Sequence, residues 1–116
     1  SSLTDVFVIT QHQPAGEKEF REKVALFSSE ISKEPGFIKL NLVKSTDEPV
    51  TWILIQEWDL IGNARRAINS SKNRMIVWPV LSTALDQPSF FEKLYEFKDN
   101  KGENFDSALN QSDESL

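Results

Sequence analysis

The first third of the chain alternates between a strand-like and a helix-like spacing of apolar residues. A strand is expected from Val6 to Ile9, with residues 10–13 carrying the chain outward before Pro14-Ala15-Gly16 breaks it. Glu17 and Glu19 then open a helix, where negative charge suits the first turn, and Pro35-Gly36 ends it. The helix has an apolar stripe at spacings of four, three and four residues, formed by Phe20, Val24, Phe27 and Ile31.

The next segment predicts two strands joined by a hairpin. One strand runs from about Phe37 to Ser45, and Thr46-Asp47-Glu48-Pro49 has the composition of a turn. The second strand, Val50 to Trp58, is the most apolar of the chain, so we expect it at the centre of the sheet. We also expect Asp59 to cap the helix that follows.

Helical spacing resumes after Asp59 and is interrupted by the polar residues 69–73. A second apolar segment runs from Met75 to Leu85, and Pro79 predicts a break or kink near Trp78-Pro79. Residues 87–89 form a loop, and an aromatic-rich final strand is expected from Phe90 to Phe97. The first part of the helical pattern is carried by Ile61, Ala64, Ala67 and Ile68.

This order of elements predicts an α+β domain with a ferredoxin-like βαββαβ antiparallel sheet and both helices on one face. In the strand ending at Trp58, residues 52, 54, 56 and 58 share one side, and residues 51, 53, 55 and 57 share the other. Both sides are mainly apolar. Because two helices cover one face only, we expect the other face to meet a second copy of the chain, giving a homodimer.

Size and composition limit the possibilities further. The 116 residues suffice for one domain, taken as residues 5–97 and followed by an acidic, polar tail over residues 98–116 with the composition of a disordered segment. The net charge of −5, without a dense basic stretch, argues against nucleic acid and anionic membranes as partners. The absence of cysteine and of a signal-peptide pattern fits a cytoplasmic protein. A single histidine excludes a multi-histidine metal site within one chain, and no cofactor is expected.

Several short segments resemble the antibiotic biosynthesis monooxygenase (ABM) family of the dimeric α/β-barrel superfamily. They are Pro35-Gly36-Phe37, the strand end Lys44-Ser45, the run Gln56-Glu57-Trp58-Asp59, and the small-residue helix at Ala64 and Ala67. The resemblance covers about residues 5–97. It implies a dimeric α/β barrel, with a pocket between the helices and the sheet of each monomer and dimerisation through the sheet faces.

Residue by residue, the resemblance carries little of the family's known chemistry. Trp58 stands where the polyketide oxygenases place a pocket tryptophan, whereas Leu54 occupies the position of their amide and Trp78 falls near that of their arginine. The haem-degrading branch uses an asparagine on the first strand, a tryptophan in the second helix and a histidine further along. Here Ala67 stands at the tryptophan position and Val77 near the histidine position. Haem degradation is therefore not expected.

His12 and Trp58 are the candidate catalytic residues. His12 is the side chain whose charge changes near neutral pH, so it suits a general base that removes a phenolic proton; alternatively it is an exposed histidine at a strand end. Trp58 would wall a pocket or simply pack the core. The candidate substrate-binding residues are Trp52, Leu54, Gln56 and Trp78, with Gln56 as a hydrogen-bond donor or a partner of a neighbouring polar group.

Two functions from different classes follow. One is a cofactor-independent monooxygenase of a small aromatic, quinol or polyketide-like substrate, in which the substrate supplies the electrons. The other is a non-catalytic dimeric module that binds a small apolar or aromatic ligand or another protein. Convergence of His12, Gln56 and Trp58 on one cavity would favour the first, and a wholly apolar pocket the second. A scaffold that presents the acidic tail is a third possibility.

Overall fold

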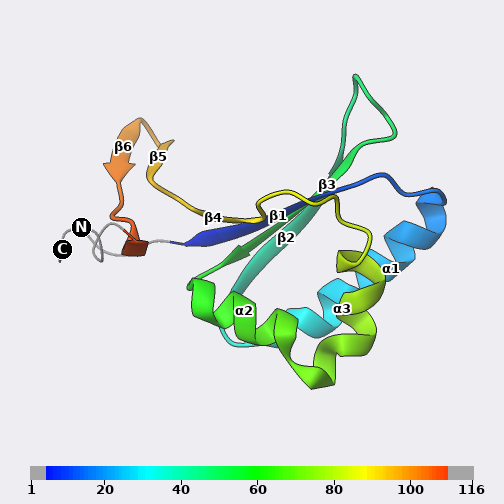
Figure 1. Cartoon of the computed structure of the whole chain (residues 1–116). Coiled ribbons are helices and arrows are strands. Elements are labelled where there is room, and N and C mark those ends of the chain that lie inside the picture. The colour runs from blue at the N-terminus through cyan, green and yellow to red at the C-terminus, as the bar shows by residue number, and fades with distance from the viewer. Residues whose placement is uncertain (1–4, 110–116) are drawn as a thin grey trace.

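The computed structural model describes residues 5–109 and contains one four-stranded antiparallel sheet with helices on one face (Figure 1). Strand β1 spans Val6–His12, followed by helix α1, Glu17–Ile31. Strands β2, Phe37–Lys44, and β3, Trp52–Trp58, form the predicted hairpin. The chain continues through α2, Ile61–Asn69, a short 3₁₀ turn η1, Ser71–Asn73, helix α3, Arg74–Leu81, and strand β4, Phe90–Glu92.

The strand order is β2-β3-β1-β4, which confirms the ferredoxin-like prediction. Strand β3 lies between β2 and β1, as its apolar composition indicated. In the β1–β3 register, Val6 lies opposite Trp58 and His12 lies opposite Trp52. The inward-facing residues of the two central strands thus form two parallel rows that the helices cover.

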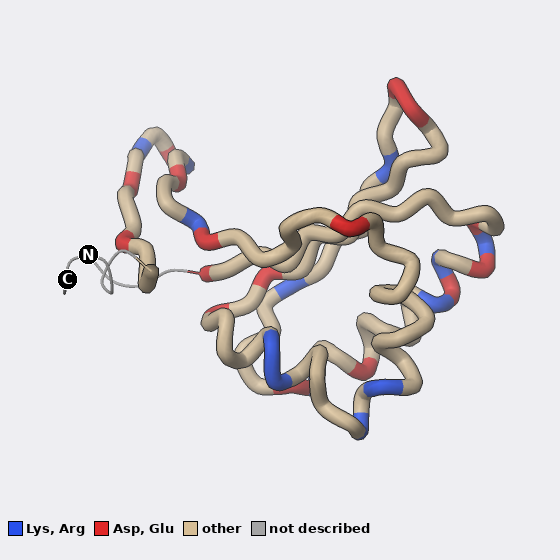
Figure 2. Tube along the Cα trace, viewed as in Figure 1, with Lys and Arg blue, Asp and Glu red and all other residues tan. Residues whose placement is uncertain are grey.

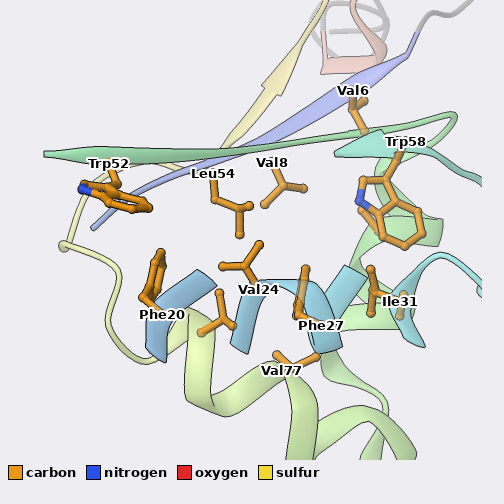
Figure 3. Close-up of a cluster of buried hydrophobic side chains, with 13 residues drawn as sticks. Val6, Val8, Phe20, Val24, Phe27, Ile31, Trp52, Leu54, Trp58 and Val77 are labelled. Atoms are coloured by element: carbon orange, nitrogen blue, oxygen red, sulfur yellow. The ribbon is translucent and has the colours of Figure 1, made fainter. Parts of the chain in front are cut away.

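The core lies between the inward face of the sheet and helix α1, with α3 closing it from below (Figure 3). All four residues of the predicted α1 stripe are buried, at 0–5 % exposure, because their spacing places them on one side of the helix. Figure 3 shows Trp52 and Trp58 at opposite ends of the inward row of β3. They are six positions apart along the strand, which is about 20 Å.

Two expectations for the helices were wrong. A break or kink was expected near Trp78-Pro79, but Pro79 does not break α3, which continues to Leu81. The interruption predicted over residues 69–73 is confirmed, since Ser70 and η1 separate α2 from α3. Asp59 does not cap α2, since the capping residue is Leu60 and makes no side-chain capping bond; the Asp59 carboxylate accepts a hydrogen bond from Nδ2 of Asn63 at 2.8 Å.

The first and last strands also differ from their predicted lengths. β1 runs to His12, so Thr10 to His12 belong to the sheet. The predicted strand from Phe90 to Phe97 is divided: β4 ends at Glu92, and a separate hairpin forms from β5, Tyr95–Lys98, and β6, Lys101–Asn104. In Figure 1 this hairpin stands apart from the sheet.

The acidic segment expected to be disordered from residue 98 onward therefore begins with ordered structure. Beyond the hairpin, the Glu92 carboxylate accepts hydrogen bonds from the Ser107 hydroxyl and, at 3.0 Å, from the backbone N–H of Ala108. The rest of the predicted tail, residues 110–116, lies outside the described part of the chain.

Candidate functional site

His12 is completely buried at the end of β1, rather than exposed as a strand-end histidine would be. Both ring nitrogens have partners: Nε2 lies 2.7 Å from the Thr10 hydroxyl and Nδ1 lies 2.8 Å from the Thr83 hydroxyl. The ring also packs against Phe20, with centroids 5.1 Å apart. Burial lowers the pKa of His12 from its ordinary value, since the imidazolium is poorly solvated there. Burial therefore favours the neutral ring, in which one nitrogen carries a proton and the other accepts a hydrogen bond.

A pocket of about 300 Å³ lies beside Thr10, between the sheet edge and the helices. We call it the β1 pocket; it is lined by residues 8–11, Ile68 of α2, Leu81 of α3, the loop over residues 84–89, and Phe90. The loop is held to β1 by backbone hydrogen bonds from Ile9 to Ser89 and from Leu85 to Gln11. The pocket exists because β4 pairs only with residues 6–8 of β1, which leaves the rest of that edge to the loop.

Gln56 and Trp58 lie in the core and are partners of each other. Both are 0 % exposed, and the indole Nε1–H of Trp58 donates to Oε1 of Gln56 at 3.0 Å. Trp58 also meets Phe37 edge to face, with ring centroids 5.3 Å apart. Nε2 of Gln56 has no hydrogen-bond partner among the described residues. Neither residue lines the pockets described here.

Trp52 and Leu54 are buried at 2 % and 0 % exposure. The indole N–H of Trp52 donates to the carbonyl of Pro49 at 3.2 Å, and its ring meets Phe20 edge to face. Trp52 lies opposite His12 in the β1–β3 register and Leu54 lies opposite Thr10. The structure therefore brings Trp52 and Leu54 near the histidine, but it does not bring His12, Gln56 and Trp58 to one cavity.

Trp78 is 70 % exposed on α3, where it lines a surface groove of about 350 Å³ with Arg74 and residues 68–70. Ile68 and Leu81 line both this groove and the β1 pocket. Of the predicted site residues, Trp78 is thus the one that a dissolved molecule can contact directly.

Charged residues of both signs are mixed along the described chain (Figure 2). On the outward face of the sheet, Lys93 lies 3.4–3.6 Å from the carboxylates of Asp5, Glu57 and Glu96. Burial raises the pKa of Glu57, as does Asp5, while Lys93 opposes the shift. For Lys93, burial alone would lower the pKa, but the three carboxylates outweigh it and raise it. No group of three potential ligand side chains among residues 5–109 could hold a metal ion.

Sequence reasoning missed Thr10 and Thr83, the two residues that hold His12. A signal for Thr10 was present, because it shares the two-residue alternation of Val6 and Val8 and so faces the helices. Thr83 is 71 positions from His12 and follows α3 in a turn, so no local pattern connects the two.

No helix of the described residues is long and apolar enough to cross a membrane.

Comparison with known proteins agrees with the fold. The family model for antibiotic biosynthesis monooxygenases matches residues 6–59, which contain β1, α1, β2 and β3. A search of curated proteins found no match.

Solved structures show the same fold at low sequence identity. SnoaB from Streptomyces nogalater, a cofactor-independent oxygenase, is 18 % identical with a TM-score of 0.67, over 78 % of this chain and 93 % of its own. A conserved protein from Methanosarcina mazei Go1 is 24 % identical with a TM-score of 0.64, over 78 % of this chain and 94 % of its own.

A third structure is a putative antibiotic biosynthesis monooxygenase from Nitrosomonas europaea. It is 14 % identical with a TM-score of 0.63, over 82 % of this chain and 95 % of its own. These likenesses establish the ferredoxin-like fold, and the family model covers the half of the domain that contains His12. Over β1 to β3 the chain is therefore similar to the antibiotic biosynthesis monooxygenase family, and its domain has the fold of the solved structures.

Proposed function

We propose that this protein is a cofactor-independent monooxygenase of a small aromatic, quinol or polyketide-like substrate. One observation carries the proposal: Thr10 lines the β1 pocket, and its hydroxyl lies 2.7 Å from Nε2 of the buried His12. A pocket beside a buried, neutral histidine is the arrangement that general-base catalysis needs. The match of residues 6–59 to the antibiotic biosynthesis monooxygenase family supports the same reaction class.

Thr10 would connect the substrate to the base. A substrate hydroxyl that donates to Oγ1 of Thr10 allows Thr10 to pass its own proton to Nε2 of His12. The substrate anion is electron-rich and reacts with oxygen directly. When a ring CH₂ becomes a carbonyl, one oxygen atom enters the product, the other leaves as water, and the substrate supplies all four electrons.

The surroundings suit an electron-rich intermediate. Part of the β1 pocket wall is apolar and suits a flat aromatic ring; it is formed by Val8, Ile68, Leu81 and Phe90. A volume of about 300 Å³ is at the small end of the range for ligand sites, so a one- to three-ring substrate is expected. In this proposal Trp52 and Leu54 lie beside His12 and Thr10 on the neighbouring strand β3. Trp78 lines the surface groove on α3.

The test is oxygen uptake by purified, metal-free protein with a panel of anthrols and hydroquinones. We expect Thr10→Val and His12→Asn to reduce uptake by about 10²-fold or more, the usual contribution of a general base. Thr46→Val, in the exposed β2–β3 turn, is the matched control and keeps wild-type uptake. Uptake that is unchanged in Thr10→Val would contradict the proposal.

A binding module is the second candidate, and the position of the predicted pocket residues favours it. Leu54 and Trp58 are sealed in the core, and Nε2 of Gln56 finds no partner there. Such a protein would bind a small apolar or aromatic ligand in the β1 pocket without consuming oxygen. Calorimetric binding of an anthrol that is never turned over would identify this function.

The outward face of the sheet supports the proposal of a homodimer. Four apolar side chains on that face are half-buried: Phe7, Ile9, Ile53 and Ile55. Val43, beside them on β2, is 44 % exposed. A sheet face this apolar needs cover, which a second copy would supply. We also propose a cytoplasmic location, which the absence of cysteine supports.

A further inference from the structure

The turn after α3 places one hydroxyl between the buried histidine and a backbone carbonyl. Oγ1 of Thr83 lies 2.8 Å from Nδ1 of His12 and 2.7 Å from the carbonyl oxygen of Val80. Thr83 is itself exposed, whereas His12 and Val80 are 0 % exposed. The side chain therefore reaches inward from the surface to a fully buried ring.

The proton positions follow from counting donors. The Val80 carbonyl can only accept, so the single hydroxyl proton of Thr83 is donated to it. Thr83 then has only lone pairs to offer His12, and the contact at Nδ1 is a hydrogen bond only if Nδ1 carries the ring proton. In a neutral imidazole, Nε2 is then the acceptor, and it accepts the Thr10 hydroxyl proton.

We infer that Thr83 is a positioning residue that fixes His12 in the Nδ1–H tautomer, so that the basic Nε2 points at Thr10 and the β1 pocket. The inference rests on the proposed function and deepens it, because it says which nitrogen takes the proton and what holds it ready. With the opposite tautomer, Nε2–H would donate to Thr10, and the ring could take no proton from the pocket side. Thr83 acts through His12 and does not itself contact the β1 pocket.

Thr83 also lies on the solvent side of the ring. It lines a second cleft, of about 260 Å³, with residues 13–16, Glu19, Phe20 and Lys23. Thr10, the partner of Nε2, lines the β1 pocket. Thr83, the partner of Nδ1, lines this cleft. After His12 accepts a proton at Nε2, both ring nitrogens carry a proton, and return of the Nε2 proton through Thr10 to the oxygen that leaves as water restores the Nδ1–H tautomer.

The first experiment reads the tautomer directly. The chain has one histidine, so the nitrogen-15 shifts of the imidazole in untagged protein are unambiguous. At pH 7.5 we expect a protonated Nδ1 and an unprotonated Nε2 in wild type, in Thr83→Ser, which keeps the hydroxyl, and in the control Thr46→Val. In Thr83→Val the Nδ1 partner is lost, and we expect the Nε2–H tautomer to become the major form.

The second experiment follows turnover of an anthrol in the same proteins. We expect kcat to fall by about tenfold or more in Thr83→Val, with little change in ligand Kd, and to return within about twofold of wild type in Thr83→Ser. If Thr83→Val lowered kcat only through a folding defect, the loss of kcat would not follow the tautomer. Recovery of both kcat and the Nδ1–H tautomer in Thr83→Ser therefore separates positioning of His12 from folding.

The outcomes separate the two proposals. An Nε2–H tautomer in wild type, or an Nδ1–H tautomer that persists in Thr83→Val, overturns the assignment of Thr83 even if the protein consumes oxygen. An Nδ1–H tautomer that depends on the Thr83 hydroxyl, in a protein that turns over no phenol, supports the assignment and contradicts the oxygenase function.

Discussion

The indole N–H of Trp58 donates to Oε1 of Gln56 at 3.0 Å, two residues earlier on the same strand and on the same buried face. For each residue the sequence left two alternatives open: contact with a ligand, or a structural role as core packing for Trp58 and as the partner of a neighbouring polar group for Gln56. In the structure they satisfy each other, at the end of β3 opposite Val6 and Val8. The pair therefore contributes mainly to the core, and the proposed chemistry lies at the other end of the sheet, at His12.

This pairing predicts strong coupling between the two residues. Trp58→Phe leaves Gln56 without any partner, and Gln56→Met leaves the indole N–H unpaired; each loss costs about 1–3 kcal/mol of unfolding free energy. The double variant removes both orphaned groups, so we expect it to be less destabilised than the sum of the single variants by about 0.5–3 kcal/mol. Urea denaturation of the four proteins measures this, and strict additivity would show that the bond contributes nothing.

Gly36 is expected to be required by the backbone itself. Its φ is +89°, and a Cβ added there would lie 2.6 Å from Nδ2 of Asn63 and closer still to the Asp59 carboxylate. We expect Gly36→Ala to lower the unfolding free energy by about 1–3 kcal/mol. Gly62→Ala is the matched control, because that glycine is helical and its Cβ would meet only the flexible end of Arg66 at 3.3 Å. Equal melting temperatures for the two variants would refute this account of Gly36.

Stability should decline in mild acid because His12 is buried as a neutral ring. Burial lowers its pKa in the folded protein below the ordinary value of 6.5, so the unfolded chain binds more protons once the pH falls below that value. The contribution of His12 to stability is complete above pH 6.5 and is lost progressively as the pH falls toward the folded pKa. A single group gives a slope of at most about 1.4 kcal/mol per pH unit.

Chemical denaturation of wild type and His12→Asn between pH 5 and 8 isolates this term. The difference in unfolding free energy between the two proteins should shrink as the pH falls. A difference independent of pH would mean that the histidine titrates alike in both states.

The proposed dimer predicts a variant that dissociates without unfolding. Ile55 lies in the middle of the outward face, paired with Ile9 and Asn41 in the sheet register. We expect Ile55→Lys to convert a dimer to a monomer in analytical ultracentrifugation, because an unpaired charge in an apolar interface costs several kcal/mol. Leu26→Lys, on an exposed position of α1, is the control and leaves the dimer intact. A wild-type protein that sediments as a monomer at micromolar concentration would contradict the proposal.

The main elements of the fold could be predicted because their spacing is regular. The α1 stripe and the two-residue alternation of β3 each identify one buried face, and the order of the elements leaves few topologies. The length of the last strand could not be predicted, since the backbone of Lys93 bonds to Asp5 and its side chain to Glu57, both distant in sequence.

The site was less accessible to sequence reasoning. His12 could be named, but the polar residues around it, Gln11 and Gln13, suggested exposure, whereas its place in the alternation of β1 buries it. The partner that sets its tautomer, Thr83, comes from the other side of the domain. Tertiary contacts of this kind leave no periodic signal.

Isotope labelling tests the central claim, that His12 drives a cofactor-free monooxygenation, most directly. Metal-free protein and an anthrol would be mixed under ¹⁸O₂, and the product analysed by mass spectrometry. The account predicts one ¹⁸O atom in the new carbonyl and loss of that product in His12→Asn. Product without ¹⁸O, or labelled product formed equally well by His12→Asn, would contradict it.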